Sequence, residues 1–243
     1  MWTLARWITA VLPRELAAAW RLVRTDFPLW AAVAVVLATL AAAGSQPGAD
    51  PRVLLPLSTL VLVVVLTTMA VRFDAAAGTA APLTIGERLK TRGLLLLFNI
   101  VSAGTICIAA AVVVRAAILL IAGDFTTATV AATYAGIFVY CGLLTRYSFV
   151  PFTAVLDERP AERRRRWTSP IERLWWPLAL STRWTEGRRL RLLPYVLILA
   201  ISTNVVAPLP RSWQLPALVL WQLVVVTAQA ALFNAYKRAK SGS

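Results

Sequence analysis

Six apolar stretches, each long enough to cross a lipid bilayer, constrain the fold of this chain more than any other feature. A bilayer core about 30 Å thick requires roughly 20 apolar residues in helical form. The stretches cover about residues 28–44, 52–73, 93–122, 127–156, 190–209 and 213–236. Apolar residues make up 59% and charged residues 15% of the 243, so too few polar residues remain to cover six such helices in a soluble core. The sequence therefore predicts an all-α, polytopic transmembrane helical bundle.

The basic residues lie almost entirely in alternate loops, and this bias predicts the orientation of the chain. Lys and Arg are concentrated in the N-terminal segment, in the loops after the second and fourth stretches, and in the C-terminal tail. The intervening loops carry only Arg52 and Arg211. Because basic loops are retained in the cytoplasm, we expect an even number of spans with both termini cytoplasmic. The Arg-rich, Lys-poor composition is typical of a GC-rich bacterial genome, so we expect the bacterial inner membrane.

The loop at 157–189 contains the stretch ERRRRWTSPIERLWWP, in which four consecutive arginines lie close to three tryptophans. Beside a bilayer, each Arg attracts anionic headgroups by about 1 kcal/mol, and Trp favours the membrane interface. Ile171, Leu174, Trp175 and Leu178 share one helical face, the pattern of a helix lying in the interface. We therefore predict a partner made of anionic lipid rather than nucleic acid. The predicted headgroup-binding residues are Arg163, Arg164, Arg165, Arg166, Trp167, Arg173, Trp175 and Trp176.

Three segments share one plan, in which a short basic amphipathic helix runs into a span and a second span returns. These pseudo-repeats cover about 13–73, 83–156 and 170–237, so interfacial helices are expected before spans one, three and five. We expect residues 1–240 to form a single integral membrane domain. The N-terminal segment lacks the pattern of a cleaved signal peptide, and residues 241–243 are expected to be a cloning remnant.

Two stretches carry a resemblance to known membrane proteins. They are RYSFVPFTAVLDERP from Arg146 and ALSTRWTEGRRLRLLP from Ala179. They resemble motifs of the YciC-like family of six-span bacterial membrane proteins and of the membrane domain attached to some glycerophosphodiester phosphodiesterases. The chain departs from that pattern by inserting AERRRRWTSPIERLWW between the two pieces. The resemblance implies an integral membrane domain with a non-catalytic role.

Charged side chains inside apolar spans are costly, which makes Arg115 and Arg146 candidate intramembrane charge sites. Arg115 lies near the outer end of its span, where it either extends to water or faces the bundle, paired with Asp124 or bound to an anionic lipid group. Arg146 lies before Pro151, which ends or kinks its helix. It either reaches the cytoplasmic headgroups or orients the following loop through Asp157 or Glu158.

The remaining polar residues predict packing rather than chemistry. Asn99, Ser102 and Thr105, with similar groups in the last two spans, either line a path or join helices through hydrogen bonds. Cys107 and Cys141 lie in apolar runs without metal or redox spacing. The chain contains no His, the commonest general base and zinc ligand. No catalytic or phosphate-binding motif is present, so we expect no enzyme activity, no cofactor and no metal.

These features favour a non-enzymatic inner-membrane protein that binds lipids and other membrane proteins, or a second copy of itself, as a subunit or organiser of a larger assembly. The alternative is a transporter or permease component for a small or amphipathic anionic solute, with Arg115 or Arg146 as the counter-charge. A third reading, an intramembrane lipid-modifying enzyme, requires acidic residues to converge on one cavity.

Overall fold

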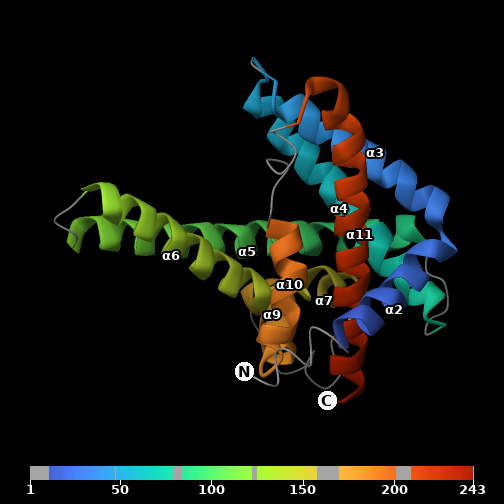
Figure 1. Ribbon diagram of the computed structural model, residues 1–243. Coiled ribbons are helices and arrows are strands. Elements are labelled where there is room, and N and C mark those ends of the chain that lie inside the picture. The colour runs from blue at the N-terminus through green and yellow to red at the C-terminus, as the bar shows by residue number, and fades with distance from the viewer. Residues whose placement is uncertain are drawn as a thin grey trace. The chain divides into compact units, whose positions relative to one another are not determined.

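Every regular element in the described part of the chain is a helix, which confirms the predicted all-α class. The computed structural model describes residues 11–46, 48–78, 84–121, 125–157, 170–200 and 209–242. The elements are α2 (Leu12–Thr25), α3 (Phe27–Gly44), α4 (Pro51–Ala76), α5 (Ile85–Ile121), α6 (Phe125–Arg146), α7 (Val150–Leu156), α9 (Pro170–Thr185), α10 (Arg189–Ala200) and α11 (Arg211–Ser241). Figure 1 traces them from the N-terminus to the C-terminus.

Five segments of the described chain are long and apolar enough to cross a membrane, so the protein is a multi-pass membrane protein. They are Phe27–Gly44, Pro51–Ala76, Ile85–Ile121, Thr129–Leu156 and Ser212–Ser241. These segments coincide with five of the six predicted spans. The predicted span at 190–209 is described only through α10, because residues 201–208 lie outside the described residues. An even number of spans therefore stays a prediction.

The chain divides into two compact units. One combines residues 1–93 with 198–243, and the other contains residues 94–197. The second part of the third predicted repeat, from 198 to 237, therefore belongs to the same unit as the first repeat. The prediction of a single membrane domain over 1–240 is not decided by this division.

The first unit is built around α11, which packs along α3 and against α2 (Figure 1), while α4 contacts all three of these helices. Its core contains aromatic side chains from three helices. The ring centroids of Trp30 and Phe73 are 5.0 Å apart, and those of Phe73 and Phe233 are 5.8 Å apart. All three side chains are fully buried. Rings at this spacing contribute attraction beyond the area that they bury.

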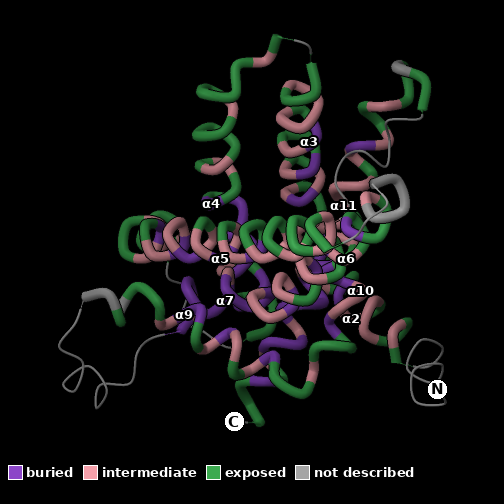
Figure 2. Tube along the Cα trace, turned by 90° about the vertical axis from the view of Figure 1, so that its left-hand side faces the viewer, coloured by how far each residue is buried: buried purple, intermediate pink, exposed green. Residues whose placement is uncertain are grey.

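Helix α4 changes character along its length, as Figure 2 shows. Its first half exposes Val53, Leu55 and Leu57, whereas Val63 and most residues from Val65 to Asp74 are buried. The side chain of Asp50 starts the helix by accepting a hydrogen bond from the backbone N–H of Arg52 at 2.8 Å, a normal N-cap. An apolar exposed half that follows a polar cap is suited to a lipid-facing span.

Ion pairs gather at the other end of α4. Asp74 accepts from Lys237 of α11 at 2.8 Å, and both side chains are mostly buried. Arg238 of α11 contacts Glu15 of α2 at 2.6 Å. Arg72 lies 3.8 Å from Asp26, which precedes α3. The start of α3, the end of α4 and the end of α11 therefore lie at one end of this unit.

The predicted amphipathic segments are helical wherever they are described. Helix α2 is a separate amphipathic helix that ends before the turn at Asp26. In contrast, the basic segment before the third span is continuous with that span in the 37-residue helix α5. Helices α9 and α10 are separated by a turn at Gly187, whose φ of 72° lies in the left-handed region that favours glycine.

Candidate functional site

The structure brings together the two stretches that carry the family resemblance. The first stretch forms the end of α6, a turn at 147–149 and α7, and the second forms the end of α9 and the start of α10. Helix α7 packs against α9, and α6 contacts α9 as well. Val150 of α7 and Leu178 of α9 are buried together with Ala103 of α5. We call this arrangement of α6, α7 and α9 the junction.

Hydroxyl groups of α9 cap the broken end of α6. The last carbonyl of α6, at Arg146, accepts hydrogen bonds from Ser181 Oγ at 3.1 Å and Thr185 Oγ1 at 3.2 Å. Ser181 Oγ also accepts from the backbone N–H of Phe149 at 3.2 Å. Terminal helix groups have no partner within their own helix, and in an apolar environment an unpaired one is costly. Ser181 and Thr185 therefore hold the chain break in place.

A second group of bonds surrounds Pro177 in the middle of α9. Proline cannot donate to the preceding turn and displaces its carbonyls. Asn99 Nδ2 of α5 donates to the carbonyl of Leu174 at 2.9 Å, and Thr153 Oγ1 of α7 donates to the carbonyl of Pro177 at 3.1 Å. Asn99 thus joins helices, as one of its two sequence interpretations proposed.

Part of the exposed surface of α9 is aromatic and apolar. Trp175 is 41% exposed and packs edge-to-face on Phe98, with 5.6 Å between ring centroids. Leu174 beside it is also exposed, whereas Leu178 is 4% exposed. The predicted apolar face of this helix is thus divided, since Leu178 enters the core and Leu174 and Trp175 remain on the surface.

Most of the predicted headgroup-binding residues have no described position. Arg163 to Arg166 and Trp167 lie outside the described residues, and so does the side chain of Arg173. Trp175 is exposed and Trp176 is half-buried in α9. Lipid binding by this set stays a prediction.

Arg146 contributes its main chain to the junction, a role that its charge did not predict. The side chain is half-buried, its Nε is buried without a hydrogen-bond partner, and the guanidinium makes no ion pair within the described residues. Asp157 is buried nearby in sequence, and Glu158 lies outside the described residues. The proposed orientation of the loop through either acid therefore stays a prediction.

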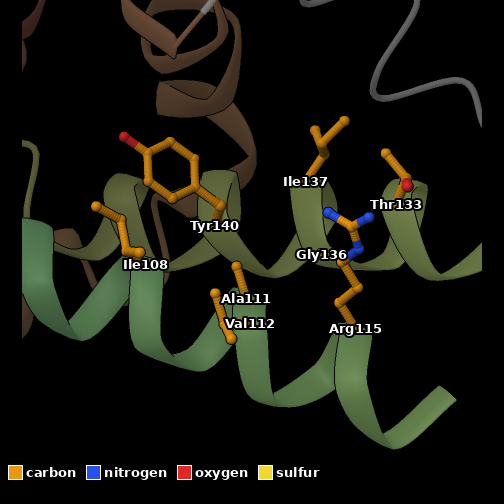
Figure 3. Close-up of a pocket in the computed structure, with 8 residues that line it drawn as sticks. All are labelled: Ile108, Ala111, Val112, Arg115, Thr133, Gly136, Ile137 and Tyr140. Carbon is orange, nitrogen blue, oxygen red and sulfur yellow. The ribbon is translucent and has the colours of Figure 1, made fainter. Parts of the chain in front are cut away.

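Arg115 lies at the edge of an open groove between α5 and α6, with a volume of about 260 Å³ (Figure 3). Its lining residues are Ile108, Ala111, Val112 and Arg115 from α5, and Thr133, Gly136, Ile137 and Tyr140 from α6. A Cβ atom at Gly136 would lie 3.3 Å from the carbonyl oxygen of Ala111. Gly136 thus permits the close approach of the two helices beside Arg115.

The described part of the chain contains two free thiols and no cluster of metal ligands. Cys107 and Cys141 are buried thiols without a disulfide, as expected for residues of apolar runs. No group of three His, Cys, Asp or Glu side chains among the described residues is arranged to hold a metal ion. Arg115, on the groove, is an exposed cation with mostly apolar neighbours.

Comparison of the chain with protein-family models, with curated proteins and with solved structures finds no match.

Sequence reasoning missed Ser181, Thr185 and Thr153. The first two are four residues apart and therefore share one face of a helix, and they follow a span that is interrupted by Pro151. A hydroxyl pair at this spacing, close to a proline break in a neighbouring span, is the signal that predicts such a cap.

Proposed function

We propose that this chain is a non-enzymatic protein of the bacterial inner membrane, with both termini in the cytoplasm. It binds anionic lipid on the cytoplasmic side and binds other membrane proteins, as a subunit or organiser of a larger assembly. The resemblance to the membrane domains of the YciC-like group is part of this proposal.

The observation that carries the proposal is the junction. Three of its hydroxyl groups, those of Ser181, Thr185 and Thr153, hold the α6–α7 break to α9 by donating to main-chain carbonyls. These groups are therefore structural. The junction leaves Trp175 and Leu174 exposed, and the chain enters α9 directly from the arginine-rich segment. An exposed aromatic surface that follows a run of cations in the sequence suits a headgroup layer.

Apolar exposure supports contact with lipid or with other membrane helices. Large apolar side chains are exposed along α5 and α6 within the second unit. They include Leu94, Val101, Ile108, Val113, Val130, Ile137 and Phe138. Exposed apolar surface of this extent marks a membrane or protein contact.

The proposal is tested by purification of the chain from native membranes, followed by identification of the proteins and lipids bound to it. We expect stoichiometric membrane-protein partners and enrichment of anionic lipid. Replacement of Arg163 to Arg166 by Gln should reduce the bound anionic lipid. A monodisperse, partnerless protein that shows no preference for anionic lipid would contradict the proposal.

Transport is the second candidate function, and the groove beside Arg115 favours it. A cation at the edge of an open pocket between two spans can serve as a counter-charge for an anionic solute. Under this proposal Arg115→Leu abolishes uptake or efflux of the solute in reconstituted vesicles, whereas under the organiser proposal the variant leaves solute fluxes unchanged.

A further inference from the structure

We infer that the groove between α5 and α6 binds one anionic phospholipid, whose phosphate contacts Arg115 and whose acyl chain lies on the apolar wall. This site is separate in sequence from the arginine-rich segment. The assignment of this site to the outer leaflet rests on the membrane orientation given in the proposed function.

The polarity of the groove matches that of a lipid. Arg115 is its only charged lining residue and makes no ion pair within the described residues. Figure 3 shows the guanidinium beside Gly136 and Thr133 at one end of the groove, and Ile108 with Tyr140 at the other. A cation at one end of an apolar surface complements an anionic headgroup with a hydrocarbon chain.

The depth of Arg115 places its charge near the headgroups. The last basic residue before the third span is Arg92, and the apolar run begins at Gly93. About 20 helical residues from that point cross the hydrocarbon core and reach Val113. Arg115 lies seven residues before the end of the predicted span at 122, within reach of the headgroups for a long side chain, while Ile108 lies about seven residues deeper. The apolar end of the groove therefore points into the hydrocarbon layer.

The groove opens on the lateral surface of these two helices. Val112 is 58% and Ile137 is 52% exposed. An acyl chain diffusing in the bilayer can enter from the side, whereas a water-soluble solute requires a path lined by polar groups. Thr133 offers only an acceptor to such a solute, because its hydroxyl already donates to the carbonyl of Thr129 at 2.8 Å. The occupant that fits is thus a lipid.

Native mass spectrometry of the detergent-purified full chain tests this inference. The added ligands are phosphatidylglycerol, phosphatidylcholine and inorganic phosphate. Each is titrated against the parent and against a variant with Arg163→Gln, Arg164→Gln, Arg165→Gln and Arg166→Gln. We expect one phosphatidylglycerol molecule to remain bound to the quadruple Arg→Gln variant, with weaker retention of phosphatidylcholine and no retention of phosphate.

In both backgrounds Arg115→Gln should weaken the retained phosphatidylglycerol about tenfold, the effect of one lost charge-assisted contact. Arg115→Lys should keep most of the binding, since a point charge still attracts phosphate. Two matched controls should bind as the parent does. Thr133→Val alters the groove without changing its charge, and Arg52→Gln removes an exposed arginine from the same predicted side of the membrane.

The outcomes separate this site from the cytoplasmic one. Unchanged lipid binding by a monodisperse Arg115→Gln protein would overturn the groove site, even if the quadruple variant loses lipid as the proposed function requires. Equal retention of phosphatidylcholine, or retention of phosphate alone, would overturn an anionic phospholipid as the occupant. Conversely, the quadruple variant could bind as much lipid as the parent and still lose one lipid on Arg115→Gln. That result would support the groove site and contradict the cytoplasmic site.

Discussion

At the scale of single residues, the polar side chains of the junction act mainly on main-chain groups. Ser181 accepts from one backbone N–H and donates to one backbone carbonyl, and it is fully buried. Loss of this hydroxyl removes one hydrogen bond from the Phe149 N–H and leaves the Arg146 carbonyl with the bond from Thr185. The cost of an unmade bond exceeds the gain of a made one.

We therefore expect Ser181→Ala to lower the free energy of unfolding by about 1–3 kcal/mol. Thermal or denaturant unfolding in detergent measures this change. Ser58→Ala is the matched control, because Ser58 is exposed and donates only within its own helix, to Leu55. Its effect should stay within about 0.5 kcal/mol. Equal effects of the two substitutions would contradict the capping role.

A second residue-scale prediction concerns the ion pair of Asp74 with Lys237, whose side chains are 12% and 27% exposed. Removing one partner strands a charge in poorly solvated surroundings, so Lys237→Met should cost about 2 kcal/mol of unfolding free energy, between the values for surface and buried pairs. Asp74→Asn in the same chain should restore part of this loss. Arg72→Gln is the control, because its pair with Asp26 is longer and more exposed, and it should cost less than about 1 kcal/mol.

At the scale of elements, long apolar periodicity predicts where helices lie but not how closely two of them approach. The boundaries of α3, α4 and α11 follow from apolar runs that end at prolines and charges. The contact at Gly136 depends on which face of α6 meets α5, and apolar character on all sides of both helices leaves that face undetermined. The sequence also does not predict the roles of Ser181 and Thr185, because their partners are main-chain groups of a segment that is distant in the chain.

The closeness of α5 and α6 is tested by a pair of glycine substitutions. An added Cβ at Gly136 lies 3.3 Å from the Ala111 carbonyl oxygen, whereas Gly142 has no atom within 4 Å of the added Cβ. Alanine in place of glycine favours a helix by about 1 kcal/mol. Gly142→Ala should therefore stabilise the protein, and Gly136→Ala should be at least about 1 kcal/mol less stable than Gly142→Ala in the same unfolding assay. Equal stability of the two variants would show that the helices are not in contact there.

At the scale of the whole molecule, the sequence predicts the all-α class and six spans, five of which coincide with long apolar helices. The side of the membrane on which the basic residues lie stays a prediction. The sequence does not predict that residues 198–243 join residues 1–93 in one compact unit. That association depends on specific partners, namely Phe73 with Phe233 and Asp74 with Lys237, which lie far apart in the chain. Hydropathy carries no information about such pairs.

This association predicts which loops lie on the same side of the membrane without the rule for basic loops, whereas the identity of that side rests on the rule. Because Lys237 pairs with Asp74, the turn at Gly78 and the C-terminal end of α11 must lie on one side of the membrane. The turn at Gly48, at the far end of the α3 and α4 hairpin, must lie on the other side.

This arrangement is measured with single cysteines introduced at Gly48, Gly78 and Gly242 in a Cys107→Ala, Cys141→Ala background. Each cysteine is labelled with a membrane-impermeant maleimide. We expect Gly78 and Gly242 to label together, only after the membrane is opened, and Gly48 to label in intact cells. Labelling of Gly78 and Gly242 from opposite sides would contradict the packing of α4 against α11, whereas a common but periplasmic location would keep that packing and reverse the proposed orientation.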